Sequence, residues 1–280
     1  MKQKHDEKVA KASINFNHEK EFAVKIFKTT VLVFRDRERY IEGEFRFRKS
    51  KFKNNPFKMV KQWAEKEMRN LKRLKTAGLN VPEAYLLKNN IIIMEFIGEN
   101  GRAAPRLKDA DLDEEQYIRA YFNTLRLMRN MLQNGNLVHG DLSEYNMLYY
   151  KNEIFIIDVS QSVELDHPMA LDFLRRDCVN VNDYFDKQNI QVLTTEKTFD
   201  FITDTSILEE NLEATLSTLL EQNTEELKNM TVDQKRKREM DDKVFQNVYI
   251  PRSLGEMSLE DLDKIHNSKP KFRTNLIIFR

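Results

Sequence analysis

The stretch LVHGDLSEYNMLYYKNEIFIIDV, residues 137–159, decides how the rest of this chain is interpreted. Its apolar, β-branched end, residues 154–159, is typical of a β-strand. Asp158 then lies at the end of a strand, and Asp141 and Asn146 lie in the loop that precedes it. Carboxylate and amide oxygens are the ligands that Mg²⁺ prefers in proteins. The stretch therefore predicts a site in which two acidic groups and one amide surround a metal ion.

The spacing of these residues indicates the chemistry. Asp141 is followed five residues later by Asn146, which matches the H-x-D-x-x-x-x-N loop of phosphoryl-transfer enzymes. In that chemistry the Asp orients the attacking hydroxyl or water and accepts its proton, while the Asn and a second Asp hold Mg²⁺. We therefore expect Asp141 to be catalytic and Asn146 and Asp158 to be metal ligands. The alternative is that Asp141 belongs to an ordinary loop turn and Asp158 to a strand end.

A lysine toward the N-terminus extends the pattern. The segment EFAVKIF, residues 21–27, is a predicted strand, and its AVKI core resembles the V-A-I-K strand whose lysine pairs with nucleotide phosphates. A lysine in a buried strand needs an anionic partner. The apolar spacing over residues 59–74 predicts a helix that supplies Glu67 as the partner of Lys25, with Glu65 as the alternative. The other interpretation is an exposed strand lysine.

The segment Ile91–Ile97, followed by Gly98, is expected to link two lobes. Backbone groups of Glu95 and Ile97 would then bind an adenine edge, with Met94 at the back of that pocket. The alternative is an ordinary core strand.

The order of the predicted elements indicates an α+β fold with a small β-rich N-lobe and a larger, mainly helical C-lobe. We expect the N-lobe at residues 1–97, the C-lobe with the catalytic loop and the metal-binding strand at 98–205, and a C-terminal helical extension and tail at 206–280. The predicted helices of the later regions are 113–133, 168–185, 196–203 and 206–229.

Composition excludes several classes of protein. The chain has 280 residues with 46 Lys and Arg against 45 Asp and Glu, and 40% of its residues are hydrophobic. Apolar runs such as Ile91–Met94 are far shorter than the roughly 20 residues of a membrane span. The N-terminus carries charge and no apolar core of a secretory signal. The single cysteine, Cys178, allows no internal disulfide, and its spacing to His139 or His167 does not support a thiol nucleophile. We expect an intracellular protein without a membrane partner.

Charge is unevenly distributed along the chain. Residues 45–75 hold 12 basic and 2 acidic residues, interleaved at first with aromatic side chains. Such a stretch is expected to contact RNA phosphates, and the alternative is a solvated helix face with a basic loop. The run KRKR, residues 235–238, is a candidate nuclear signal, although its acidic neighbours favour an exposed helix end.

These motifs together resemble the RIO family of atypical serine protein kinases, and within it the RIO kinase one subfamily. The matching segments are FAVKIFKTTVLVFRDRERYIEGEFRFR (22–48), WAEKEMRNLKRL (63–74), IIIMEFIGENGRAAPRL (91–107), LVHGDLSEYNMLYY (137–150), IIDVSQSVELDHPMALDFLRRDCVNVNDYF (156–185) and, weakly, VYIPRSLGEM (248–257). The resemblance implies a trimmed two-lobe kinase fold, ATP and Mg²⁺ as cofactors, and phosphorylation of itself or of proteins on Ser. It further implies a kinase or ATPase role in late maturation of the small (40S) ribosomal subunit. Its partners would be the pre-40S particle and its RNA, and it would be cytoplasmic with shuttling to the nucleus.

The resemblance also assigns roles to residues. Lys25 would contact the ATP phosphates with Glu67 as its partner, Asp141 would be the catalytic aspartate, and Asn146 would bind metal. Asp158 would bind metal and, in this family, can itself accept the phosphoryl group as an aspartyl-phosphate.

The chain departs from the family pattern at its N-terminus. The family has a phosphate loop resembling S-T-G-K-E-A-N-V-Y before the lysine strand, whereas residues 1–42 hold no glycine and the first is Gly43. Glycine allows close approach of backbone to phosphate, so we expect weakened nucleotide binding. The alternative function is a catalytically weakened or inactive module that docks on pre-ribosomal particles. A small-molecule phosphotransferase is a third interpretation, which the RIO-like segment HPMALDFLRRDCVNVNDYF, residues 167–185, disfavours.

Overall fold

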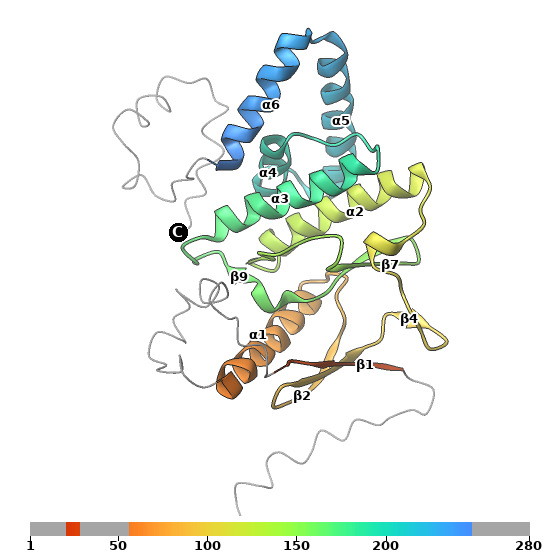
Figure 1. Cartoon of the computed structure of the whole chain (residues 1–280), viewed down its shortest axis with the longest axis vertical. Helices are drawn as coiled ribbons and strands as arrows, with labels where there is room; N and C mark the ends of the chain where they lie inside the picture. The colour runs from red at the N-terminus through yellow and green to blue at the C-terminus, as the bar shows by residue number, and fades with distance from the viewer. Residues whose placement is uncertain (1–20, 29–55, 248–280) are drawn as a thin grey trace, which may run out of the picture.

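The computed structural model describes residues 21–28 and 56–247, and it has a small sheet with one long helix at one end and a larger set of helices at the other (Figure 1). The described part of the chain thus has the predicted α+β arrangement of a small β-rich lobe and a larger helical lobe. The first lobe comprises β1 (Phe22–Ile26), α1 (Pro56–Thr76), β2 (Ala84–Lys88) and β3 (Ile91–Glu95).

The larger lobe follows in the chain and has more helices. Its strands are β4 (Gly98–Glu99), β5 (Arg102–Ala103), β6 (Leu137–Val138), β7 (Met147–Tyr150), β8 (Glu153–Ile156) and β9 (Val163–Glu164). Its α-helices are α2 (Glu114–Gln133), α3 (Ala170–Lys187), α4 (Thr195–Thr203), α5 (Leu212–Asn229) and α6 (Val232–Asn247), and its 3₁₀ turns are η2 (Leu107–Asp109), η3 (Val159–Gln161) and η4 (Glu209–Asn211).

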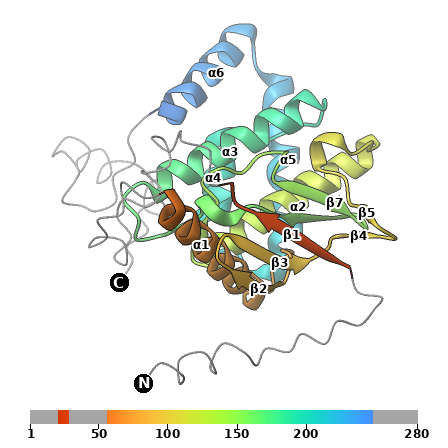
Figure 2. The same ribbon diagram turned by 60° about the horizontal axis from the view of Figure 1, so that its bottom comes forward.

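The sheet of the small lobe is antiparallel, with the strand order β1-β3-β2 (Figure 2). Strand β1 pairs with β3 in a register that sets Lys25 opposite Ile92. Because side chains alternate along a strand, the exposed Val24 and Ile26 point away from the face that carries Lys25. This register directs the lysine toward α1.

Helix α1 packs on this lobe through the apolar side chains that the sequence predicted. Trp63, Leu71 and Leu74 are buried in the common core. The helix ends at Thr76, and Gly78 two residues later has a positive φ of 80° that suits glycine. The Leu79 N–H donates to the Leu74 carbonyl at 3.0 Å and the Gly78 N–H to the Lys75 carbonyl at 3.1 Å, the hydrogen-bond pair of a Schellman motif. Gly78 is the C′ residue of this motif.

The core of the larger lobe forms between α2, α3 and α4 (Figure 1). Helix α2 starts with a capping box, because Asp113 accepts from the Gln116 N–H and the Gln116 side chain accepts from the Asp113 N–H. Tyr121 of α2 and Phe185 of α3 are fully buried, with ring centroids 5.1 Å apart. This core is the rigid support for the loops at the boundary with the small lobe.

Three predictions of element boundaries were wrong in detail. The strand expected at 154–159 ends at Ile156, because Asp158 takes a left-handed conformation with φ 58° and ψ 58° that no strand accommodates. The helix expected at 206–229 begins only at Leu212, after the turn η4. The basic run 235–238 lies within α6 rather than at a helix end.

Some predictions fall on residues outside the described part of the chain. They are the N-terminal phosphate-loop segment within 1–20, the basic stretch from 45 to 55 and the weak match at 248–257.

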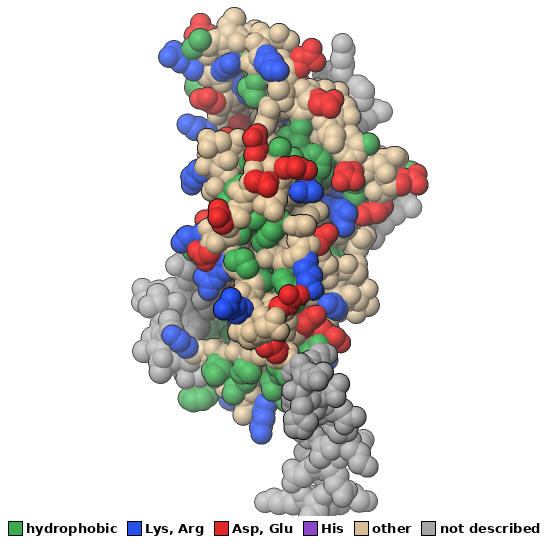
Figure 3. Space-filling view, turned by 90° about the vertical axis from the view of Figure 1, so that its right-hand side faces the viewer, with side chains coloured by type: hydrophobic (Ala, Val, Ile, Leu, Met, Phe, Trp, Pro, Cys, Tyr) green, Lys and Arg blue, Asp and Glu red, His purple; other side chains and the backbone are tan. Residues whose placement is uncertain are grey.

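Among the described helices, none is long and apolar enough to span a membrane. The side of the molecule in Figure 3 carries acidic and basic side chains interspersed. The lobe boundaries remain a prediction.

Candidate active site

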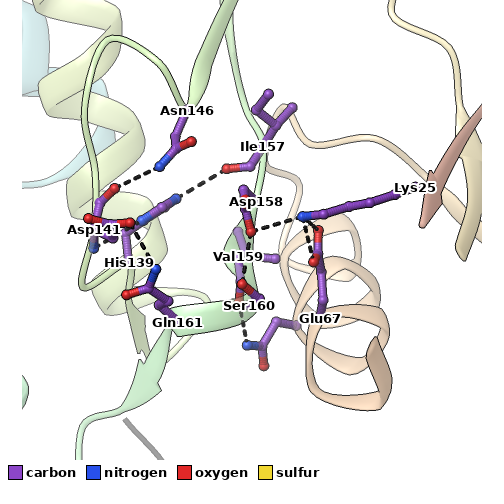
Figure 4. Close-up of polar contacts among 11 residues, drawn as sticks. Lys25, Glu67, His139, Asp141, Asn146, Ile157, Asp158, Val159, Ser160 and Gln161 are labelled. Carbon is purple, nitrogen blue, oxygen red and sulfur yellow. Dashed lines mark hydrogen bonds and ion pairs between the residues drawn. The ribbon is translucent and has the colours of Figure 1, made fainter. Parts of the chain in front are cut away.

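A three-way ionic contact joins the two lobes. The Lys25 Nζ lies 2.8 and 2.7 Å from the two carboxylate oxygens of Glu67 and 2.9 Å from Asp158 Oδ1 (Figure 4). These residues come from β1, from α1 and from the segment that follows β8. The expected pairing of Lys25 with Glu67 is confirmed. The alternative partner Glu65 is half-exposed and lies 3.9 Å from Lys61 instead.

Burial and charge act in opposite directions on these carboxyl groups. Burial raises the pKa of Glu67 to about 7 against the opposing effect of Lys25. Burial also acts to raise the pKa of Asp158, but the Lys25 ammonium and the Ser160 hydroxyl outweigh it, and this pKa lies below its ordinary value. Asp158 is therefore an anion at neutral pH.

The loop between β6 and β7 presents Asp141 and Asn146 toward Asp158 (Figure 4). The Asn146 Nδ2 donates to the Asp141 carbonyl at 2.8 Å. Because this bond uses the amide nitrogen, the Asn146 Oδ1 is directed away from its own loop and can serve as a ligand. The Gln161 Nε2 donates to Asp141 Oδ2 at 2.9 Å.

Two buried side chains, Asp177 and His139, hold the backbone of this loop in place. Asp177 of α3 accepts from the Gly140 and Leu142 N–H groups, both at 2.8 Å, and so clamps the backbone on either side of Asp141. Burial raises the pKa of Asp177 to about 7, although both backbone bonds oppose the shift. His139 accepts from the Asp141 N–H at its Nδ1, 3.3 Å away, which leaves its Nε2 to donate to the Ile157 carbonyl at 3.3 Å. Burial lowers the pKa of His139 to about 4, so this ring is neutral at pH 7 and positions the loop without adding charge.

A Mg²⁺ ion fits the donor set that Asp158 and Asn146 offer. Both supply hard oxygen ligands, and Mg²⁺ usually takes one or two carboxylates, with substrate phosphates and water completing its shell. Within residues 21–28 and 56–247, no group of three or more His, Cys, Asp or Glu side chains could bind a metal by itself. An ion held by Asn146 and Asp158 would complete its shell with substrate phosphates and water. The assignment of Asn146 and Asp158 as metal ligands remains a prediction.

Backbone hydrogen bonds within the protein reduce the number of Glu95 and Ile97 groups that could contact an adenine edge. The Glu95 N–H donates to the Glu83 carbonyl at 2.8 Å, and the Ile97 carbonyl accepts from the Ala104 N–H at 2.9 Å. The Glu95 N–H and the Ile97 carbonyl therefore already have hydrogen-bond partners within the protein. The Glu95 carbonyl and the Ile97 N–H remain the candidates for an adenine edge. Met94 is buried in the core, and its place at the back of an adenine pocket remains a prediction.

Several residues of the site were not predicted from the sequence. Two of them, Asp177 and Asn70, could have been noticed as polar residues within the apolar stripe of a helix. Asp177 interrupts the apolar stripe of α3, which includes Phe173, Cys178 and Val181, and a polar residue on a buried stripe usually has a specific partner. Asn70 interrupts the stripe of α1 in the same way and is 7% exposed. Gln161 and Ser160 left no such signal. Cys178 is fully buried and burial raises the pKa of its thiol well above the ordinary value, which excludes the thiol nucleophile.

The arrangement of these site residues defines the class of protein. A small antiparallel sheet carries a lysine that is paired with a helix glutamate. The helical lobe carries an Asp and an Asn in one loop and a second Asp after the β-hairpin that follows. Together these are the parts of a protein-kinase-like domain. The RIO domain family model matches residues 8–198. The chain belongs to the RIO family of serine/threonine-protein kinases, in its RIO1 subfamily.

Relatives with curated names agree with this assignment. The chain is 51% identical over 247 residues to the serine/threonine-protein kinase rio1 of Dictyostelium discoideum and 48% identical over 241 residues to human RIO1. These alignments cover 88% and 86% of this chain but only 42% of each relative, so the chain spans less than half the length of either. A solved Rio2 kinase from Chaetomium thermophilum, in an ADP/Mg²⁺-phosphoaspartate complex, aligns with 74% of this chain and 65% of its own at 18% identity, with a TM-score of 0.47. That structural likeness is too weak to inform the site.

Proposed function

We propose that this chain is a Mg²⁺-ATP-dependent serine/threonine kinase or ATPase. Lys25 would hold the ATP phosphates, Asn146 and Asp158 would hold the metal, and Asp141 would accept the proton of the attacking hydroxyl. The metal would neutralise charge on the transferred phosphoryl group. The observation that supports this most strongly is the contact of Lys25 with both Glu67 and Asp158, because it brings the phosphate-binding cation to the predicted metal ligand at 2.9 Å.

The acceptor of the phosphoryl group is part of the proposal. A serine hydroxyl of a protein substrate, or of the chain itself, attacks the γ-phosphorus, the bond to the bridging oxygen breaks, and ADP leaves. In the ATPase version an Asp158 carboxylate oxygen attacks instead, and water then hydrolyses the acyl phosphate to regenerate the carboxylate.

Binding of Mg²⁺-ATP is the test of this function. Because a ligand that binds only the folded state stabilises it, we expect the melting temperature to rise with Mg²⁺-ATP concentration, by an amount equivalent to about 2.7 kcal/mol at 100 times Kd. The measurement is a thermal-shift titration with and without EDTA, and Lys25→Met is the matched variant expected to lose most of the shift. No shift at millimolar Mg²⁺-ATP would contradict the proposal and favour the alternative, a docking module without turnover.

A role in late maturation of the 40S subunit is proposed with it, in contact with the RNA of the pre-40S particle and with shuttling between cytoplasm and nucleus. The described part of the basic stretch supports an RNA contact. On α1 the side chains of Lys58, Lys61, Arg69 and Lys72 are exposed at intervals that place them along one side of the helix. Glu65 is the one acidic residue of α1 on that side, since Glu67 is buried.

Salt-dependent RNA binding tests this contact. Changing these four residues to Gln should lower the affinity for ribosomal RNA and reduce the slope of log K against log salt by up to about 3, since each phosphate contact contributes about 0.7 on single strands. The measurement is a filter-binding salt titration. The matched control changes four exposed lysines of the helical lobe, namely Lys187, Lys228, Lys235 and Lys237, to Gln. An equal loss in both variants would show that only net charge matters and would contradict a contact at α1.

A further inference from the structure

The turn η3 connects the two acidic residues of the site. It follows Asp158 directly, and the left-handed conformation of Asp158 reverses the chain there. The Ser160 Oγ donates to Asp158 Oδ1 at 2.8 Å, and the next residue, Gln161, reaches across to Asp141 Oδ2 at 2.9 Å (Figure 4). One turn of three residues therefore contacts both the predicted metal ligand and the predicted catalytic aspartate.

The turn is itself held in place by the small lobe. The buried Asn70 of α1 donates from Nδ2 to the Val159 carbonyl at 2.8 Å. Val159 is fully buried and Ser160 is 6% exposed. Asn70 lies one helical turn after Glu67, so the same face of α1 holds both the lysine partner and the turn. The backbone that carries Gln161 is therefore held by buried contacts of the two preceding residues.

The direction of the bond between Gln161 and Asp141 follows from chemistry. An ionised carboxylate only accepts hydrogen bonds, so the amide NH₂ group of Gln161 must face it. A bond to one carboxylate oxygen restricts rotation of the Asp141 carboxylate about its Cβ–Cγ bond. A general base needs such restriction, because small misplacements of a reacting group reduce the rate strongly.

We propose that Gln161 is a positioning residue for Asp141: its amide orients the carboxylate that accepts the proton of the attacking hydroxyl. This inference rests on the proposed phosphotransferase function and adds to it a residue outside the metal and phosphate contacts. Gln161 acts only through Asp141, so its removal slows the chemical step and leaves Mg²⁺-ATP binding intact.

Two substitutions of similar size and shape test the proposal in the full chain. Gln161→Met removes the donor, and Gln161→Glu replaces it with a carboxylate beside Asp141. We expect kcat to fall by about 10- to 100-fold in Gln161→Met and further in Gln161→Glu, while KM for ATP stays within about twofold and the melting temperature is unchanged. Gln222→Met, at an exposed position of α5, is the matched control.

A double-mutant cycle separates positioning from a general structural effect. In an Asp141→Asn background, adding Gln161→Met should leave the residual single-turnover rate unchanged, because Gln161 has no base left to orient. A full additional loss in that background would overturn the inference, as would a wild-type kcat in Gln161→Met. A wild-type chain that binds no Mg²⁺-ATP and has no turnover would instead overturn the proposed function and, with it, this inference.

Discussion

Changing Asp158 to Asn is expected to abolish both Mg²⁺-dependent nucleotide binding and turnover. Asn preserves the shape of the side chain and can still accept the Ser160 hydrogen bond, so only the negative charge is removed. That charge is what the proposed metal site needs, and it also contacts Lys25 at 2.9 Å. Loss of several kcal/mol of transition-state stabilisation by a metal corresponds to a decrease in kcat/KM of about 10³-fold or more.

The measurements are a thermal-shift titration with Mg²⁺-ATP and release of labelled phosphate. Asp183→Asn, at an exposed position of α3, is the matched control and should behave as the wild type. If Asp158→Asn retained the ATP-induced shift and turned over within tenfold of the wild type, Asp158 could not be a metal ligand. The aspartyl-phosphate proposal is checked in the same samples, because a hydroxylamine-sensitive label on the wild-type protein should be absent from the variant.

Changing Asp141 to Asn is expected to lower kcat by about 10²- to 10⁴-fold, the usual contribution of a general base. Binding of Mg²⁺-ATP should persist, because Asp141 is not among the residues expected to bind the ATP phosphates or the metal. The Asn oxygen can also still accept from Gln161, so the fold of the loop should be kept. The contrast with Asp158→Asn, which loses binding and turnover together, is the main result to look for.

Single-turnover phosphoryl transfer and the Mg²⁺-ATP thermal shift, measured on the same preparation, distinguish the two roles. A variant that lost the thermal shift as well would place Asp141 in the binding site rather than in the chemical step. A variant with an undiminished rate would show that no base is needed, as in a mechanism in which the metal-bound phosphate itself takes the proton.

Much of this site could be predicted because its signals are local. The interval between Asp141 and Asn146 fixes their place in one loop, and the apolar spacing of α1 put Glu67 on the buried side of its helix. A partly buried strand lysine and a buried helix glutamate then become partners, since the buried carboxylate is not stable without a cation beside it. The observed distances of 2.7 and 2.8 Å agree with that reasoning.

The contacts that hold these groups in place could not be predicted in the same way. Gln161 bonds to a residue 20 positions away, Asp177 to backbone groups 35 and 37 positions away, and Asn70 to a carbonyl 89 positions away. Hydrophobic periodicity reports which side of an element is buried, but it does not report which distant atom a buried polar group will contact. It also did not indicate that the Glu95 N–H and the Ile97 carbonyl would form hydrogen bonds within the protein.

The residue pattern alone was therefore enough to establish the two-lobe α+β fold and the chemical groups proposed for phosphoryl transfer, because strand alternation, helical spacing and short motif intervals are properties of neighbouring residues. The tertiary structure decided how those groups are oriented: which carboxylate oxygen Gln161 binds, how Asn70 ties the turn η3 to α1, and how Asp177 holds the loop. These orientations depend on hydrogen bonds between buried groups far apart in the chain, and such bonds form only after the packing of helices and strands has brought their atoms within about 3 Å.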